Sequence, residues 1–179
     1  MLKHEKNKLI IGYVVGFLIF VITIPSLIYL VSRIEYDFFK IPVIGSIVYR
    51  LILVGILFII GMTFVVWSNI DLLRIGKGGP TDVFNVKISP RSKKLVVTGP
   101  YRYTRNPMVL GINSIYVAIA IFINSLGSLI FCLLFLFVII IYLKMTEEKR
   151  LLKDFGDEYS DYKKRVSMIV PFRKKEKDN

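Results

Sequence analysis

The chain contains three long stretches of apolar residues that carry almost no charge. Residues 9–31 and 108–143 have no charged side chain, and residues 43–67 have only Arg50. A helix needs about 20 mainly apolar residues to cross the hydrocarbon core of a bilayer, which is about 30 Å thick. A soluble domain does not gather its apolar residues into runs of this length. The sequence therefore predicts an all-α integral membrane protein.

The last apolar stretch is too long for a single span. As one helix, its 36 residues would extend about 54 Å. The residues Asn-Ser-Leu-Gly-Ser at 124–128 lie near its middle and are typical of a turn. We therefore predict two short helices, over residues 108–123 and 129–143, that form a hairpin. The expected fold is a bundle of about four transmembrane helices followed by cytoplasmic C-terminal helices.

The basic residues predict which side of the membrane each segment faces. Of the 25 Lys and Arg residues, 22 lie in residues 1–8, 73–107 and 144–179. Basic residues are enriched in cytoplasmic loops, so these three segments, both termini and the functional residues among them are expected in the cytoplasm. The net charge of +12 is then explained by topology, and we expect no nucleic-acid partner.

Arg50 lies about seven residues inside the second apolar stretch. A charge at that depth is costly and by itself suggests a function. The favoured interpretation is that its long side chain reaches the outer interface and pairs with Glu35 or Asp37.

Beyond residue 143 the sequence keeps a helical period up to Gly156, which is expected to end that helix. Tyr159, Tyr162 and Val166 then recur at helical spacing. This spacing predicts an amphipathic helix over residues 157–166 that lies along the membrane interface.

The composition excludes several kinds of chemistry. The only histidine is His4 and the only cysteine is Cys132. A histidine-based triad, an internal disulfide, a thiolate cluster and a metal site with two imidazoles are therefore all excluded.

Three polar segments stand out once the spans are set aside. Residues 99–107 read Gly-Pro-Tyr-Arg-Tyr-Thr-Arg-Asn-Pro and lead into the third span, a glutamate pair stands at 147–148, and residues 155–171 run from Phe-Gly-Asp-Glu-Tyr to Val-Pro. A helix that begins at Pro107 points free N–H groups and its positive dipole end toward Arg105. Such a site suits a carboxylate beside a flat ring or a cation, and the glutamates suit ammonium, sulfonium or ribose hydroxyl groups. Each segment taken alone also fits interfacial anchoring or solvation of a helix end.

Taken in order, these segments resemble the isoprenylcysteine carboxyl methyltransferase family and its relatives, the phospholipid N-methyltransferases. The resemblance covers about residues 76–172. Asn106 stands where the family usually has His, and Val109 where it has Tyr. The matching residues are Gly99, Pro100, Tyr101, Arg105, Pro107, Gly111, Glu147, Glu148, Phe155, Gly156, Tyr159, Tyr162, Val166 and Pro171.

The resemblance implies S-adenosylmethionine as methyl donor, with Arg105 and Glu148 as the catalytic pair and no metal. It implies one membrane domain over residues 1–179, in which residues 1–72 give two spans and residues 73–179 form the cofactor-binding half. The residues expected to bind the donor are Gly99, Pro100, Tyr101, Arg105, Asn106, Pro107, Gly111, Glu147 and Glu148.

The expected acceptor is a lipophilic small molecule or a prenylated group that is reached from the membrane lipid, past the loop at residues 76–80. By resemblance the first choice is carboxyl O-methylation of an isoprenylcysteine-like substrate, and the alternative is N-methylation of phospholipid ethanolamine. An amine would have to lose a proton, to Glu147, Glu148 or water, whereas a carboxylate would not. Methylation of a small thiol and a non-enzymatic membrane scaffold stay open as alternatives, as does the oligomeric state.

Overall fold

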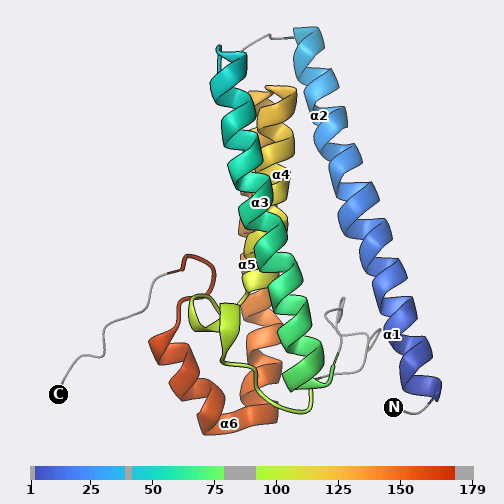
Figure 1. The fold of residues 1–179 in the computed structure, drawn as a ribbon, viewed down its shortest axis with the longest axis vertical. Helices are drawn as coiled ribbons and strands as arrows, with labels where there is room; N and C mark the ends of the chain where they lie inside the picture. The colour runs from blue at the N-terminus through green and yellow to red at the C-terminus, as the bar shows by residue number, and fades with distance from the viewer. Residues whose placement is uncertain (1–2, 39–41, 79–91, 172–179) are drawn as a thin grey trace, which may run out of the picture.

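The computed structural model describes residues 3–38, 42–78 and 92–171. Within these residues the chain is a bundle of helices (Figure 1), and three helical segments are long and apolar enough to cross a membrane: Asn7–Phe38, Ile47–Gly76 and Leu126–Met145. The shorter apolar helix Pro107–Ile123 stands among them. The predicted all-α membrane bundle that ends in a short helical hairpin is thereby confirmed; about four spans were expected, and the first helix of the hairpin, with 17 residues, is shorter than the three that are long enough to cross.

The first span is one continuous helical segment built from α1 (Lys3–Gly16), the π-helix η1 (Phe17–Thr23) and α2 (Ile24–Phe38). Pro25 has no N–H, and its ring crowds the carbonyl of the preceding turn. The chain adapts just before it, because the Ile24 N–H donates to the Ile19 carbonyl five residues back. The disturbance expected from a proline is thus absorbed by a π-helical turn, and the helix does not end there.

The second span, α3 (Ile47–Asp71) with its π-helical end η2 (Leu72–Gly76), packs tightly against α4 (Pro107–Ile123). The two helices touch where Gly61 meets Gly111. A Cβ atom at Gly61 would lie 2.7 Å from the Gly111 carbonyl oxygen, and one at Gly111 would lie 2.6 Å from the Gly61 oxygen. Small residues are what allow two membrane helices to approach this closely.

A two-residue turn joins α4 to α5 (Leu126–Met145). Asn124 adopts the left-handed conformation, with φ 63° and ψ 43°, and Ser125 caps α5 by accepting from the Ser128 N–H. Glu35 of α2 completes this cap, since its carboxylate accepts from the N–H groups of Leu126 (3.1 Å) and Gly127 (3.0 Å). The hairpin turn predicted at residues 124–128 is therefore correct, although α5 begins earlier than expected.

The expected pairing of Arg50 with Glu35 or Asp37 is wrong. Among the described residues no ion pair joins Arg50 to either carboxylate, and Arg50 Nε is buried without a hydrogen-bond partner. The physical reason is that the Glu35 carboxylate already accepts hydrogen bonds from the first N–H groups of α5, which have no partner within their own helix.

The last helix, α6 (Glu147–Arg165), is interrupted at Gly156, where φ is 51° and ψ is −126°. The predicted helix end at this glycine is confirmed. The second half turns back beneath the bundle (Figure 1), where Tyr159, Tyr162 and Val166 are buried and pack with Leu95, Tyr101, Leu151 and Phe155. The apolar face of this second half is covered by protein, and its predicted position along the membrane interface stays a prediction.

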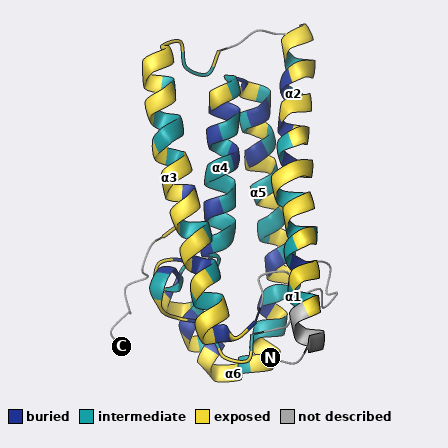
Figure 2. Ribbon diagram, turned by 45° about the vertical axis from the view of Figure 1, so that its right-hand side comes forward, coloured by how far each residue is buried: buried dark blue, intermediate teal, exposed yellow. Residues whose placement is uncertain are grey.

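Large apolar side chains are exposed along the outer faces of the spans (Figure 2), among them Phe17, Ile59 and Phe137. Soluble proteins rarely expose apolar patches of more than a few hundred Å². By contrast, α4 buries much of its length between the other spans. This distribution is what a bundle surrounded by lipid requires.

Candidate active site

The bend before α4 is fixed by the chain segment that follows α6. The short helix η3 (Gly99–Arg102) precedes the bend, and Pro107 is the first residue of α4, as predicted. The Arg105 N–H donates to the Ser167 carbonyl at 2.9 Å, and the Asn106 side-chain amide donates to the Met168 carbonyl at 3.1 Å. Residues 167 and 168 thus hold the backbone of Arg105 and the side chain of Asn106 in place, although about 60 positions separate the two segments in the sequence.

The side chain of Arg105 forms a buried ion pair with Glu148. Each of the two side chains is only 8% exposed. Arg105 Nη1 also donates to the Tyr159 hydroxyl at 3.2 Å, and Lys163 Nζ lies 2.5 Å from the second oxygen of Glu148. Both carboxylate oxygens of Glu148 therefore accept from cations.

Lys163 has a place in this cluster that its position in the sequence did not suggest. It lies 15 residues beyond Glu148 on α6, too far to meet it along a straight helix. The break at Gly156 turns the second half of α6 back, and this brings Tyr159 and Lys163 to Glu148. Glu147, on the neighbouring position, pairs with Arg150 at 3.2 Å.

Three tyrosines lie near the ion pair: Tyr159 and Tyr162 are buried, and Tyr101 is partly buried. Burial raises the pKa of Tyr101, and the charges of Glu147 and Asp71 raise it further. Burial also raises the pKa of Tyr162 and of Tyr159, against the opposing charge of Arg105. These phenols are protonated at neutral pH, and the Tyr162 hydroxyl donates to the Tyr101 carbonyl at 2.6 Å.

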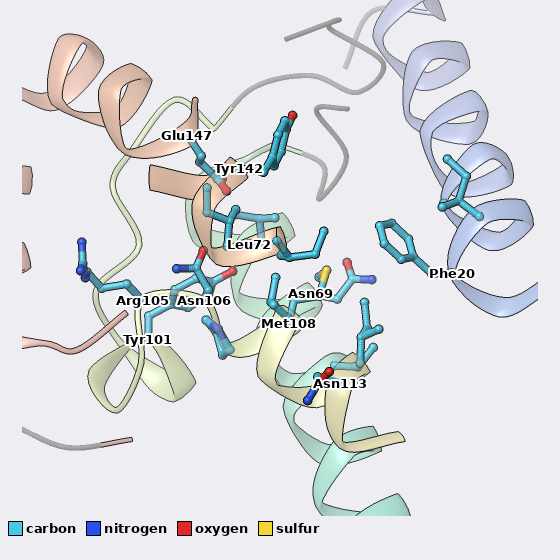
Figure 3. A pocket seen from close by; sticks show the side chains of 18 of the residues that line it. Phe20, Asn69, Leu72, Tyr101, Arg105, Asn106, Met108, Asn113, Tyr142 and Glu147 are labelled. Carbon is cyan, nitrogen blue, oxygen red and sulfur yellow. The ribbon is translucent and has the colours of Figure 1, made fainter. Parts of the chain in front are cut away.

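A cavity of about 1380 Å³ extends from this cluster into the spans. Its polar end is lined by six of the predicted donor-binding residues, and Figure 3 shows four of them with Met108 and Asn113. These six are Tyr101, Arg105, Asn106, Pro107, Glu147 and Glu148.

The rest of the cavity is mainly apolar and lies between the N-terminal helix, α3, α4 and α5, with side chains such as Phe20, Leu72 and Met108 on its walls. Two hydrogen bonds hold the N-terminal helix across it. The Tyr13 hydroxyl donates to Asn69 Oδ1 at 2.6 Å, and the Tyr116 hydroxyl donates to the Phe20 carbonyl at 2.8 Å. Spacing along the chain does not indicate these contacts, because each joins residues more than 50 positions apart.

Gly99, Pro100 and Gly111 are not among the residues that line the cavity. Gly99 has a φ of 55°, and a Cβ there would collide with the Asp71 carboxylate and lie 3.0 Å from Trp67 Nε1. Pro100 is fully buried and Gly111 meets Gly61 in α3. Packing accounts for all three residues, and their predicted contact with the donor stays a prediction. Of the loop predicted to shape the acceptor's route, residues 79 and 80 lie outside the described part of the chain.

Together these features describe a helical membrane protein in which a cavity joins a charged, buried end to an apolar region among the spans. The sequence model of the phospholipid methyltransferase family matches residues 49–158, which is more than half of the chain and includes the bend, the hairpin and the glutamate pair. The protein belongs to this family of membrane methyltransferases.

A curated relative is methanethiol S-methyltransferase 1 of Bradyrhizobium diazoefficiens, which is 35% identical over 74 residues. The aligned part is 41% of this chain and 25% of the relative. The chain thus spans about a quarter of the length of that protein.

Proposed function

We propose that the protein transfers a methyl group from S-adenosylmethionine to a lipophilic acceptor at the cytoplasmic face of the membrane. The observation that carries this proposal is the single cavity that joins a charged end to an apolar chamber. Its volume of about 1380 Å³ exceeds the roughly 300–1,000 Å³ of a site for one small ligand. Two substrates that meet in one chamber account for that size, and membership of the family supports methyl transfer.

The residues at the charged end fit the proposed donor. Arg105 offers a guanidinium to a carboxylate, and its Nε is buried without a partner among the described residues. Glu147 and Glu148 place negative charge where a sulfonium, an ammonium or ribose hydroxyls would be bound, and Tyr101 offers an aromatic wall. The donor, once bound, supplies a methyl group already activated by its sulfonium sulfur.

The protein's own contribution is alignment and exclusion of water. In this proposal Arg105 orients a carboxylate, either the donor's or the acceptor's. Glu148 holds Arg105 in place and adds negative charge beside the sulfonium, and the apolar walls keep water from the reacting atoms. Gly99 and Gly111 permit the close packing around the bend and α4, and Pro100 is fully buried.

Carboxyl O-methylation of an isoprenylcysteine-like substrate is the first candidate reaction. A carboxylate can attack the methyl group without losing a proton. This suits the site, because both oxygens of Glu148 already accept from Arg105 and Lys163, which leaves Glu148 poorly placed to take up a proton. N-methylation of phospholipid ethanolamine is the second candidate, and the description of the family favours it. That reaction needs a proton acceptor, a role we assign to Glu147, which lines the cavity.

The proposed orientation places the charged end of the cavity in the cytoplasm. The start of α1 and the whole of α6 lie at the same end of the bundle (Figure 1), as expected if both termini are cytoplasmic. In this arrangement residues 1–72 form two spans that face the lipid, and residues 73–179 form the donor-binding half. The acceptor then reaches the apolar chamber from the bilayer.

Labelled-methyl transfer tests the proposal. The purified protein in lipid nanodiscs is incubated with labelled S-adenosylmethionine and, separately, with a prenylcysteine, a phosphatidylethanolamine and a long-chain thiol. Transfer to one acceptor that falls at least tenfold in Glu147→Gln, but not in Glu158→Gln, is the expected result. Glu158 is a matched control, because it is exposed and does not line the cavity. Absence of transfer to all three, together with absence of donor binding, would favour a membrane scaffold.

A further inference from the structure

Asn113 is a polar side chain in the apolar part of the cavity, in the middle of a membrane-spanning helix. It lies six residues beyond Pro107, which is about 9 Å further along α4. Figure 3 shows its amide beside the cavity, well apart from Arg105 and Glu147. The proposed transfer of a methyl group gives this residue no role.

The amide of Asn113 differs from the other polar groups of the spans. The hydroxyls of Ser26, Thr63 and Ser114 donate to carbonyls of their own helix at 2.7–2.9 Å. Asn113 Oδ1, in contrast, is buried without a hydrogen-bond partner among the residues the structure describes. An unpaired amide oxygen in apolar surroundings is unfavourable, because nothing there replaces the hydrogen bond that it accepts in water. Polar residues placed in spans in this way mark functional sites.

We infer that Asn113 binds an uncharged group that donates a hydrogen bond, a hydroxyl, within the apolar part of the methyl acceptor. This inference rests on the proposed function. The unpaired atom is the amide oxygen, which accepts hydrogen bonds, so a hydroxyl can satisfy it whereas a carbonyl, which only accepts, cannot. A charged group is disfavoured at this depth, because the charged side chains that line the cavity, such as Arg105 and Glu148, lie outside the spans. Asn113 is thus a specificity-determining residue that selects acceptors with a polar group several bonds from the methylated atom.

The test observes the Asn113 amide directly and needs neither donor nor turnover. The protein, with isotope-labelled asparagine, is placed in nanodiscs of ether-linked phosphatidylcholine, which contain no ester carbonyl. Its side-chain amide resonances are followed by NMR during titration with methyl dodecanoate, dodecanol and dodecane. The Asn113→Leu variant assigns the resonance, and Ser114→Ala is the matched control, since Ser114 is the adjacent residue and does not line the cavity.

A saturable shift of the Asn113 amide with the alcohol, and not with the ester or with dodecane, is the expected result. The affinity for the alcohol should fall about fivefold in Asn113→Leu and stay unchanged in Ser114→Ala. The ester accepts hydrogen bonds but donates none, so an equal response to the ester and the alcohol would overturn the inference. Asn113→Leu should also unfold at the same temperature as the wild type or a higher one, because it removes an unpaired polar group.

Equal responses to all three ligands, or a loss of stability in Asn113→Leu, would overturn the inference. Donor binding without any shift at Asn113 would overturn this inference alone. A shift at Asn113 in a protein that binds no donor would instead overturn the proposed function and leave a lipid-binding site.

Discussion

The buried ion pair between Arg105 and Glu148 gives the sharpest prediction about stability. Replacing Glu148 by Gln keeps the shape of the side chain and removes its charge. Arg105 is then left 8% exposed beside a neutral amide, with the Tyr159 hydroxyl as its one other side-chain partner among the described residues. Lys163, which is 42% exposed, can move into solvent. The substitution therefore leaves Arg105 buried without a charged partner, whereas Lys163 can be solvated.

The expected loss of folding free energy follows from these exposures. Breaking a buried pair by removing one partner is destabilising by about 3–5 kcal/mol. We expect about 3 kcal/mol for Glu148→Gln, at the lower end of that range, because the new amide still accepts one hydrogen bond from Arg105. Lys163→Met removes a half-exposed, solvent-screened partner and should be destabilising by less than about 1 kcal/mol.

Denaturant unfolding in micelles measures both values. The chain has one tryptophan, Trp67, whose ring lies against Gly99 in the short helix before the bend, so its fluorescence reports on this region. The paired variant Arg105→Met with Glu148→Met should lose much less stability than the sum of the two single changes, because no charge is left buried. Equal losses of folding free energy for Glu148→Gln and Lys163→Met would contradict the prediction that the buried pair matters more.

Three further predictions concern the fold around the site. Gly111→Ala should be destabilising by about 1–3 kcal/mol, since its Cβ would lie 2.6 Å from the Gly61 oxygen. Gly55→Ala is the control and should not be destabilising, because a Cβ there would have nothing within 4 Å. Equal melting temperatures of the two variants would contradict this prediction. Glu35→Ala should lower the free energy of unfolding by about 1–2 kcal/mol through loss of the α5 cap, measured by the same denaturant titration. The hydroxyls of Tyr101, Tyr159 and Tyr162 have raised pKa values, so the unfolded chain loses their protons first and stability should fall as the pH rises above about 10. Unfolding midpoints that stay constant from neutral pH to pH 11 would contradict the last prediction.

Much of the fold could be predicted because lipid imposes a simple rule on sequence. Apolar runs of sufficient length must be helices, since every backbone group has to be paired within its own segment. The turn at Asn124 and the helix end at Gly156 were also predictable, because Asn and Gly are the residues that most readily adopt a positive φ, and the chain does adopt one at both positions. The segment of residues 99–107 was found from its order of residues, and six of the nine predicted donor-binding residues line one cavity.

The contacts that complete the site could not be predicted from the sequence. Tyr159 and Lys163 reach Glu148 only because α6 folds back after Gly156, and spacing along a helix does not reveal such a turn. Glu35 was expected to meet Arg50, but the unpaired N–H groups at the start of α5 take its carboxylate. In both cases the outcome depends on which groups tertiary packing brings together, and a single sequence does not contain that information.

Binding of S-adenosylmethionine at the charged end of the cavity is best measured by calorimetry on the purified protein in lipid nanodiscs, with Glu147→Gln and Glu158→Gln as a matched pair of variants. We expect saturable binding that is at least tenfold weaker in Glu147→Gln and unchanged in Glu158→Gln. If the folded protein binds no donor, or if both variants bind it equally well, the charged end is not the donor site.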